Sequence, residues 1–444
     1  MVKKFPVGGG AGDPNLSESL SETSNVTLNE GDDSAECSFS YTPIQPFSQE
    51  LISRDRIGRE LFAVDLFRVK KKILYHFLTH GHQDHYGSIG KNWNRPIYCT
   101  PTTAALLPHL TRRRTGQQFI RESGVREELM QRLQLGVAQD FDNFRVTALD
   151  ANHCLGAAML LFEGEDPIFQ DGPILFTGDI RADRTLMERF ETNAGYKRLS
   201  QLKLGHIFLD DTYLCDEAEH FPARDELIPK IVDLARTFSP TLKLLLPLHK
   251  LGKEDVLVAV ARGLKEKICL DPGRWESREL LFPPEDLEYF VGEEDPQDAR
   301  IFVCLRRRCG EVYQHLFSQG IDAVVINLTK QKISLSRHIH ESICYNFPYS
   351  DHSSYTELVS FCSRLRTKFL HPWSGKVDVE HPRWKRLRSA CTSDTFAEPP
   401  AAKQRRLADS LTADLEEIDC TTTIPISVNG IDMNEFAPAL NGAK

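Results

Sequence analysis

No run of apolar residues in this sequence is long enough to span a membrane, and no apolar stretch of the signal-peptide kind follows the first residues. No two of its 11 cysteines form a C-x-x-C pair; they are spread from Cys37 to Cys420. A membrane segment and a disulfide framework are therefore not expected. We expect mostly buried free thiols in a protein from a reducing compartment.

An excess of positive charge is missing as well, because 54 Lys and Arg face 63 Asp and Glu, which gives a formal net charge of -9. The charge is uneven: residues 1–36 contribute -5 and residues 376–444 contribute -2, which leaves about -2 on the central 37–375. Binding to nucleic acid depends on the local field rather than on the total. The net charge therefore excludes neither DNA nor RNA as a partner.

Apolar side chains are plentiful only between the two ends of the chain. Residues 1–40 are rich in Gly, Ser, Asn and acidic groups, and residues 376–444 in Pro, Ala, Ser and charge, so both are expected to be disordered. The 444 residues, 41% of them hydrophobic, allow two or three domains. Lys385-Arg386 and the basic run at 403–406 resemble a bipartite nuclear import signal, which predicts a nuclear location.

The segment THGHQDHYGSIG carries the densest group of potential metal ligands. It places His80, His82, Asp84 and His85 within six residues, and the chain has only 15 histidines. An apolar run typical of a buried strand precedes it, and a loop leaving a strand end can direct these side chains into one volume. Neutral imidazole suits Zn²⁺, and the carboxylate adds charge for a second centre. We therefore predict a metal site rather than a surface loop that is His-rich by chance.

Further acids and imidazoles recur where predicted strands end. His153 lies in the loop of VTALDANHCLGAAMLL, Asp179 ends ILFTGD, and Asp210 follows HIFL. Each alone would more often be structural, but with the first cluster they form a series at strand ends. Asp65, inside the apolar ELFAVDLFR, is expected to orient a ligand imidazole by accepting a hydrogen bond from its other ring nitrogen.

From about residue 213 to 330, helices and strands alternate, as in an inserted α/β domain. Within it the turn GKE, with Lys253, follows a predicted strand and opens a helix; later FPYSDHSSY supplies His352. A helix N-terminus with a Lys and hydroxyl donors can bind a phosphate. The candidates for such a site are Lys253, Ser350, Ser353 and Ser354. The alternative is that the Lys is solvated and the serines cap the following helix.

The order of these motifs resembles the metallo-β-lactamase family. Asp65, HGHQDH, His153 and TGD are similar to its four signature motifs, and LDDT and PYSDHSSY are similar to the first two motifs of its β-CASP nuclease branch. The resemblance covers about 60–375. Within the branch, AVD, IYCTPTTAALL, TGDIR, LGKE and PYSDHSSY most resemble the DNA cross-link repair exonucleases, and less the end-processing endonuclease.

The resemblance implies an α/β fold, a four-layer αββα sandwich with an inserted β-CASP α/β domain. The corresponding ranges are 41–212 for the first part of the sandwich, 213–330 for the insert and 331–375 for the return to the sandwich. Disordered segments at 1–40 and 376–444 would flank them.

The resemblance also implies a metal-dependent 5′→3′ DNA exonuclease that prefers 5′-phosphorylated single-stranded ends, or the 5′ ends of duplexes, in interstrand cross-link repair or at telomere ends. Its partners would be DNA and repair or telomere proteins, with no membrane. A first Zn²⁺ would be held by His80, His82, His153 and Asp179; a second ion, Zn²⁺, Mg²⁺ or Mn²⁺, by Asp84, His85, the bridging Asp179 and His352. The metal would lower the pKa of bound water toward ~7 and provide hydroxide for phosphodiester hydrolysis. Catalytic support would come from Asp84, Asp210, His352 and Asp65.

Three positions depart from the family pattern or leave it open. Leu155 follows Cys154 where relatives usually have Pro, and Phe302 stands where we align a family His at the edge of the site, which would weaken activity. Leu370 aligns with the apolar residue of the DNA enzymes, but a shift of one residue would put His371 there, as in RNA enzymes. The open alternatives are a β-CASP RNA-processing nuclease and a DNA-end-binding protein with a weakened site. A small-molecule lactamase or thioesterase would not explain the insert.

Overall fold

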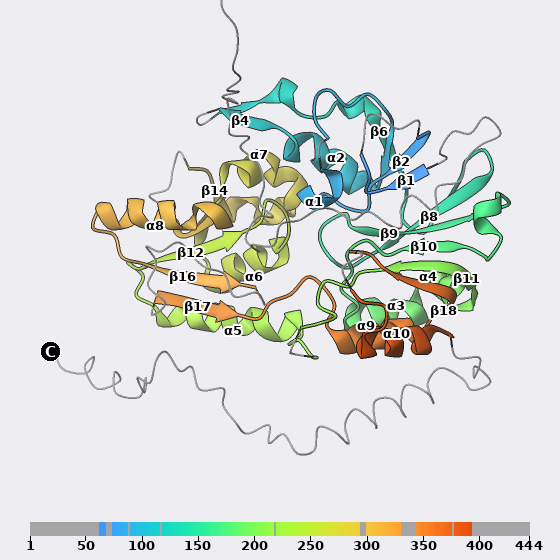
Figure 1. Ribbon diagram of the computed structural model, residues 1–444. Helices are drawn as coiled ribbons and strands as arrows, with labels where there is room; N and C mark the ends of the chain where they lie inside the picture. Colours follow the sequence, from blue (N-terminus) through green and yellow to red (C-terminus); the bar gives the residue numbers. More distant parts are fainter. Residues whose placement is uncertain are drawn as a thin grey trace, which may run out of the picture. The chain divides into compact units, whose positions relative to one another are not determined.

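A computed structural model describes residues 62–67, 73–87, 89–115, 118–216, 219–293, 299–329, 343–374 and 377–392 (Figure 1). The expected disorder of 1–40 and of 393–444, with the basic run at 403–406, lies outside the described residues. None of the described helices combines the length and apolarity that crossing a bilayer requires. All nine cysteines in the described ranges are free and six are buried, in agreement with the expected free thiols.

Two β-sheets form the centre of the larger domain. The first is parallel, with the order β1-β2-β3-β6; the second has the order β18-β11-β10-β9-β8-β7, parallel from β18 to β10 and antiparallel from β10 to β7. The strands are β1 (Phe62–Val64), β2 (Tyr75–Phe77), β3 (Ile97–Cys99), β6 (Met130–Arg132), β7 (Ala138–Asp140), β8 (Phe144–Asp150), β9 (Ala158–Gly164), β10 (Ile174–Phe176), β11 (Lys203–Leu209) and β18 (Arg366–Pro372).

The period of two along the strands decides which core each side chain enters. In β9, Leu160 and Phe162 point into the core between the two sheets, whereas Met159 and Leu161 point into the core beneath the helices of the second sheet. The core between the sheets is aromatic: the rings of Phe62 and Phe162, from opposite sheets, stack with centroids 4.4 Å apart. Burial on both faces therefore holds the second sheet between two apolar layers.

Helices cover the two outer faces. The first sheet packs against α1 (Gln83–Tyr86) and α2 (Pro101–Leu110), and the second against four helices. Those four are α3 (Arg184–Thr192), α4 (Ala194–Gln201), α9 (Tyr355–Cys362) and α10 (Pro382–Thr392). This arrangement is the αββα sandwich, so the predicted fold class is confirmed. The predicted disordered tail from 376 is wrong for α10, because Trp384 and Leu387 are buried in the core it shares with α9.

The inserted domain has its own parallel sheet, with the order β14-β13-β15-β12-β16-β17. The strands are β12 (Lys243–Leu248), β13 (Lys267–Cys269), β14 (Phe290–Val291), β15 (Ala299–Leu305), β16 (Ala323–Leu328) and β17 (Cys344–Phe347). The helices are α5 (Arg224–Thr237), α6 (Glu254–Leu264), α7 (Pro272–Leu281) and α8 (Cys309–Ser318). Because β17 pairs with β16, the predicted end of the insert at 330 is too early.

Both faces of the insert sheet are covered. Leu244 and Leu246 of β12 enter the core with α5 and α6, and Leu245 enters the core with α8. Phe302 packs into that second core, with the ammonium of Lys243 5.5 Å from its ring centroid. The predicted place of Phe302 at the edge of the site is therefore wrong, since its side chain contributes to the apolar packing of the insert.

Short elements complete the description. They are the antiparallel pair β4 (Arg113–Thr115) and β5 (Gln118–Ile120), and the 3-10 turns η1 (Arg121–Ser123), η2 (Glu127–Leu129), η3 (Pro167–Phe169), η4 (Pro284–Tyr289) and η6 (Arg306–Arg308).

Candidate metal centre

The predicted site residues leave strand ends that meet at one edge of the sandwich. Asp65 follows β1, His80 follows β2, Asp179 follows β10 and Asp210 follows β11. A backbone hydrogen bond of 3.0 Å from Ala158 N to the Thr79 carbonyl joins the two sheets here. Gly178, with φ +52°, packs closely on the Thr79 side chain, because a Cβ on it would lie 2.7 Å from Thr79 Cβ. The fold thus brings ligands from distant parts of the sequence together.

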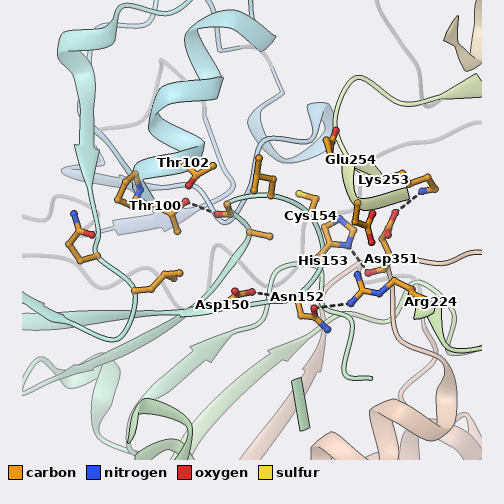
Figure 2. A pocket seen from close by; sticks show the side chains of 17 residues that line it. Thr100, Thr102, Asp150, Asn152, His153, Cys154, Arg224, Lys253, Glu254 and Asp351 are labelled. Carbon is orange, nitrogen blue, oxygen red and sulfur yellow. Dashed lines mark hydrogen bonds and ion pairs between the residues drawn. The ribbon is translucent and has the colours of Figure 1, made fainter. Parts of the chain in front are cut away.

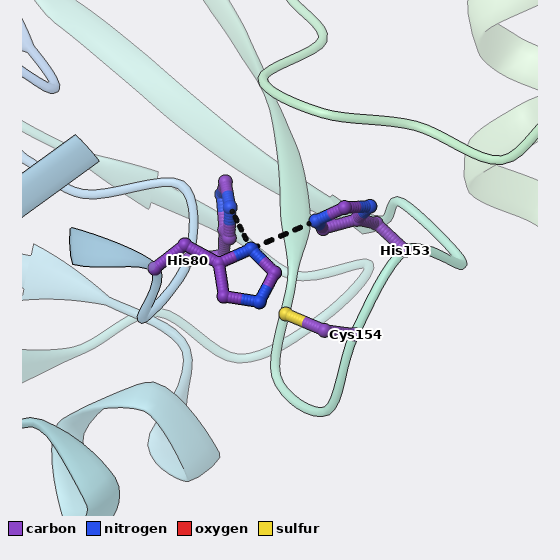
Figure 3. Close-up of side chains that lie close together, drawn as sticks. His80, His153 and Cys154 are labelled. Atoms are coloured by element: carbon purple, nitrogen blue, oxygen red, sulfur yellow. Dashed lines mark hydrogen bonds between the residues drawn. The ribbon is translucent and has the colours of Figure 1, made fainter. Parts of the chain in front are cut away.

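The imidazoles of His80, His82 and His153 form the first group, and the carboxylate of Asp179 lies beside it; Figure 3 shows His80 and His153 facing each other. Nδ1 of His82 lies 3.0 Å from Nε2 of His80 and 3.0 Å from Nε2 of His153. Oδ2 of Asp179 lies 3.6 Å from Nε2 of His80 and 3.6 Å from Nε2 of His153. Ligands bound tetrahedrally at about 2.0 Å are separated by roughly 3.3 Å, so these four distances are close to those between the ligand atoms of a zinc site.

The outer ring nitrogens of this group fix the protonation of the inner ones. His82 Nε2 donates to the carbonyl of Leu251 (3.2 Å) and His153 Nδ1 to the carbonyl of Asp351 (2.8 Å), since a carbonyl can only accept. Thr79 Oγ1 donates to Asp65 (2.6 Å) and therefore accepts from His80 Nδ1 (3.0 Å). With the protons outside, the inner nitrogens present lone pairs to one another. A cation between them would remove this repulsion, which is why the group fits a metal ion.

A second group lies on the other side of Asp179. His85 Nε2 is 3.3 Å from Asp179 Oδ1, and His352 Nε2 is 3.7 Å from Oδ2. The side chain of Asp84 is 70% exposed, and its Oδ2 lies 3.8 Å from His85 Nε2. The structure therefore brings His85, Asp179 and His352 together, while Asp84 stands at the rim.

Two buried acids hold the imidazoles of the second group. Asp65 accepts from His85 Nδ1 at 2.6 Å, which is the role predicted for it. Asp210 Oδ2 accepts from His352 Nδ1 at 2.9 Å and from the backbone N–H of Ile180 at 3.0 Å. Both acids touch an imidazole rather than the volume between the ligands, so they position the ligands.

The charges of this cluster shift the pKa values in opposite directions. Burial, with the nearby His352, lowers the pKa of His153 to about 3. Burial also lowers the pKa of His352, but the carboxylates of Asp210 and Asp179 outweigh it and raise that pKa to about 9. Asp179 is buried too, yet the surrounding imidazoles hold its pKa well below the usual range. The protein therefore presents an ionised carboxylate beneath neutral and protonated imidazoles.

Three positioning residues were not predicted from the sequence. Arg181 is fully buried, donates to the carbonyls of Ser350 (2.8 Å) and His352 (3.3 Å), and pairs with Glu357 at 3.0 Å. Leu251 and Asp351 contribute the carbonyls that orient His82 and His153. The motif TGDIR contains Arg181, but its role depends on a segment 170 residues away in the chain that only the fold brings near. Backbone carbonyls leave no signal in a sequence.

Cys154 is a further neighbour that sequence reasoning did not place at the site. Its sulfur and the inner nitrogens of His80, His82 and His153 all lie within 4.8 Å of one another (Figure 3). Burial and several carboxylates raise the pKa of its thiol well above the usual range. In the absence of an ion, Cys154 therefore lies beside the three imidazoles as a neutral thiol.

A cavity of about 550 Å³ opens beside His153 (Figure 2). Its two cationic side chains are paired: Lys253 Nζ is 2.6 Å from Asp351, and Arg224 is 2.8 Å from Asp183. Leu155 lies on its wall and is 37% exposed. The departure at Leu155 thus changes the lining of the cavity and leaves the ligand group intact.

The predicted phosphate site is not supported by the contacts of its serines. Ser350 bonds to the backbone of His352, and Ser353 to Ile180 and Ala182. Ser354 forms the capping box of α9 with Glu357. All three serines are at most 3% exposed, so they have structural roles. At Lys253, the amide of Gly252 is taken by the carboxylate of Glu254 (2.9 Å), which closes this helix start to an anion.

His371, the residue that would have favoured an RNA enzyme, contacts residues outside the ligand groups. Nε2 of His371 is 3.0 Å from Nδ1 of His206, and its ring stacks on Phe208 with centroids 4.7 Å apart. Leu370 is buried in the core below α9 and α10. Neither side chain belongs to the ligand groups.

The sandwich, the inserted α/β domain and the His–Asp cluster at the strand ends define the class: a metallo-β-lactamase fold with a β-CASP insert. A family model described as "DNA repair metallo-beta-lactamase" matches residues 314–374. In this segment and in its fold, the chain is similar to Apollo and the DNA cross-link repair proteins.

Several relatives show the same likeness. The chain is 34% identical over 306 residues to 5′ exonuclease Apollo of Mus musculus, which covers 68% of this chain and 52% of that protein. It is 30% identical over 310 residues to 5′ exonuclease Apollo of Gallus gallus, covering 68% and 60%. It is 29% identical over 343 residues to DNA cross-link repair 1A protein of Mus musculus, covering 71% and 30%. The chain thus spans less than two thirds of the length of these relatives.

Proposed function

We propose that this chain is a metal-dependent DNA nuclease, a 5′→3′ exonuclease that acts on 5′ ends in DNA repair in the nucleus. The observation that carries the proposal is the convergence of four imidazoles on Asp179, with His82 beside two of them, and each of the five has its outer ring nitrogen held. The printed names of the relatives, 5′ exonuclease Apollo and DNA cross-link repair 1A protein, support DNA as the substrate.

The first ion would be held by His80, His82, His153 and Asp179. Three imidazoles and a carboxylate are a ligand set that suits Zn²⁺. A second, Zn²⁺, Mg²⁺ or Mn²⁺, would be held between Asp179 and His85, approached by Asp84 and His352. Bound metal would activate water and neutralise charge on the phosphate.

The protein's own part in hydrolysis would fall to the pair of Asp210 and His352. Asp210 fixes the imidazole through Nδ1, which leaves Nε2 directed at the cluster. Because the pKa of His352 is raised to about 9, Nε2 carries a proton at neutral pH when no second ion is bound. In that state the proton would be available to the 3′ oxygen that leaves when the phosphodiester bond breaks; where an ion occupies Nε2, His352 would instead help to hold that ion.

Nuclease assays test the proposal directly. The purified full chain, loaded with Zn²⁺ or Mn²⁺, is given linear single-stranded DNA with a 5′-phosphate or a 5′-hydroxyl, circular single-stranded DNA and matched linear RNA. We expect nucleotides to be released from the 5′ end of linear DNA, fastest from phosphorylated ends. Cleavage of the circle, or faster cleavage of RNA, would overturn the assignment as a DNA exonuclease.

A further inference from the structure

The strands of the insert sheet have their carboxyl ends on the side of the metal centre. Leu248 of β12 and Leu305 of β15 are register partners in adjacent parallel strands, so His249 and Arg306 leave the sheet at the same carboxyl edge. The loop that begins at His249 reaches the metal centre, since its Leu251 carbonyl bonds to His82. The carboxyl edge of an open parallel sheet is where α/β domains bind ligands.

Arg306 is the unusual side chain at this edge. Its Nε is buried and has no hydrogen-bond partner, and the structure gives it no ion pair with any of the residues it describes. The titratable group that acts on its pKa is Tyr213, whose own pKa burial raises to about 12, so this group is uncharged at neutral pH. The guanidinium charge is therefore partly buried without a counter-charge, which is costly unless a ligand supplies one.

Two neighbouring residues relate Arg306 to the metal centre, because its charge acts on the pKa values of both Tyr213 and His249. The ring of Tyr213 lies 5.8 Å from that of His352. On the other side His249 is exposed, and the charges of Arg306, Lys253 and His82 act on it together. The other cations near this edge already have partners: Lys253 pairs with Asp351, and Arg274 with Asp271. Arg306 is thus the cation here whose charge is left for a substrate.

We propose that Arg306, with His249 beside it at the carboxyl edge of the insert sheet, binds a phosphate group of the nucleic-acid substrate. The proposal rests on the nuclease function proposed above. A guanidinium donates two parallel hydrogen bonds to a phosphate, which matches the unsatisfied donor and the missing counter-charge. The phosphate bound there is either the terminal 5′-phosphate or that of a nearby linkage, and the two sources are separated by experiment.

The test compares Arg306→Gln with a matched control, Arg308→Gln. Arg308 lies in the same turn, but it is exposed and pairs with Glu311 at 3.1 Å. Binding of single-stranded oligodeoxynucleotides is measured by fluorescence anisotropy on the full chain in EDTA, which prevents cleavage, and circular dichroism checks the fold. The oligonucleotides carry a 5′-phosphate, a 5′-hydroxyl, or one neutral methylphosphonate at the first, second or third linkage.

Arg306→Gln should weaken binding about tenfold to a hundredfold, the effect of one charge-assisted contact. It should also reduce the slope of log affinity against log salt by about 0.7, the value for one phosphate on a single strand. Arg308→Gln should leave both unchanged. The phosphate that Arg306 contacts is the one whose neutralisation or removal weakens DNA binding by the wild type but not by Arg306→Gln.

Wild-type affinity and slope in Arg306→Gln, or equal losses in both variants, would overturn the inference. A loss accompanied by a lower melting temperature and an unchanged slope would do the same, because it would show a structural role. If the chain cleaves DNA but Arg306→Gln binds normally, the inference fails and the function stands. If no substrate is cleaved but the slope changes, the proposed nuclease function fails and the phosphate contact stands.

Discussion

Replacing Asp65 by Asn should weaken metal binding without removing a ligand. The carboxylate accepts from the amide of Thr79 (2.8 Å), from its hydroxyl (2.6 Å) and from Nδ1 of His85 (2.6 Å). In Asn, one oxygen becomes an NH₂ group that faces at least one of these donors. Asn tolerates the left-handed backbone found at Asp65 (φ +49°), so the change is confined to the hydrogen bonds.

Two magnitudes follow from these contacts. A buried donor left unsatisfied costs about 1–3 kcal/mol of folding stability. Loss of the carboxylate behind a ligand imidazole lowers metal affinity by about tenfold to a hundredfold. The ion held through His85 should be affected most, because Asp65 touches that ring directly. Competition with a chromophoric chelator measures the affinity of each bound ion.

Asp211→Asn is a matched control. Asp211 is also a buried acid at a strand end, and it also accepts from one backbone amide (2.8 Å) and one hydroxyl (2.5 Å), both of Ser374. It contacts none of the histidines of the cluster. Both variants should lose stability in urea, but only Asp65→Asn should lose metal affinity. Equal metal affinity in the two variants would refute the orienting role of Asp65.

The remaining predictions concern protonation, end recognition and the insert. The raised pKa of His352 stabilises the metal-free chain fully below pH 6.5, and this stabilisation is lost as the pH rises through about 9. The melting temperature of the wild type should therefore fall over this range, and His352→Gln should flatten the fall. An unchanged fall in His352→Gln would disprove the contribution of His352. Lys253→Ala should slow 5′-phosphorylated and 5′-hydroxyl DNA equally, because Lys253 acts through Asp351; selective slowing of the phosphorylated substrate would restore it as a phosphate ligand. Phe302→His should destabilise the chain by about 1–3 kcal/mol in urea without raising activity, since it places a polar ring in the apolar core with α8; higher activity would return Phe302 to the site.

The cluster of imidazoles and carboxylates could be predicted from the sequence because its members recur in the same setting. His80, His153, Asp179 and Asp210 all follow apolar runs that become buried strands, and strand ends converge in a layered α/β fold. The resemblance of these motifs to the metallo-β-lactamase family implied the sandwich, and the alternation of predicted helices and strands indicated the insert. The boundaries were less accurate: β17 is short and only partly buried, α10 is rich in charged residues, and only their packing partners show that they belong to the folded domains.

The predicted phosphate site shows what local sequence leaves undetermined. A serine before a helix has the same sequence signal whether its hydroxyl caps the helix or reaches a ligand, and Ser354 caps. A Lys at a helix start can bind a phosphate only if no nearby carboxylate already pairs with it. Asp351 pairs with Lys253 but lies 98 residues away in the chain, so the sequence does not show this ion pair. Arg306 shows the converse case, since its missing partner is visible only once its surroundings are known.

The insert also takes part in building the metal centre. Two of the three imidazoles in the first group are oriented by carbonyls of the insert and of the segment returning from it: Leu251 holds His82, and Asp351 holds His153. The ion pair between Lys253 and Asp351 ties those two segments to each other at 2.6 Å. An ion bound by this group would therefore stabilise the contact between the insert and the sandwich as well as the ligands. This coupling is reciprocal. A change that breaks the contact of the insert loop should therefore lower metal affinity by the free energy with which the bound ion stabilises that contact.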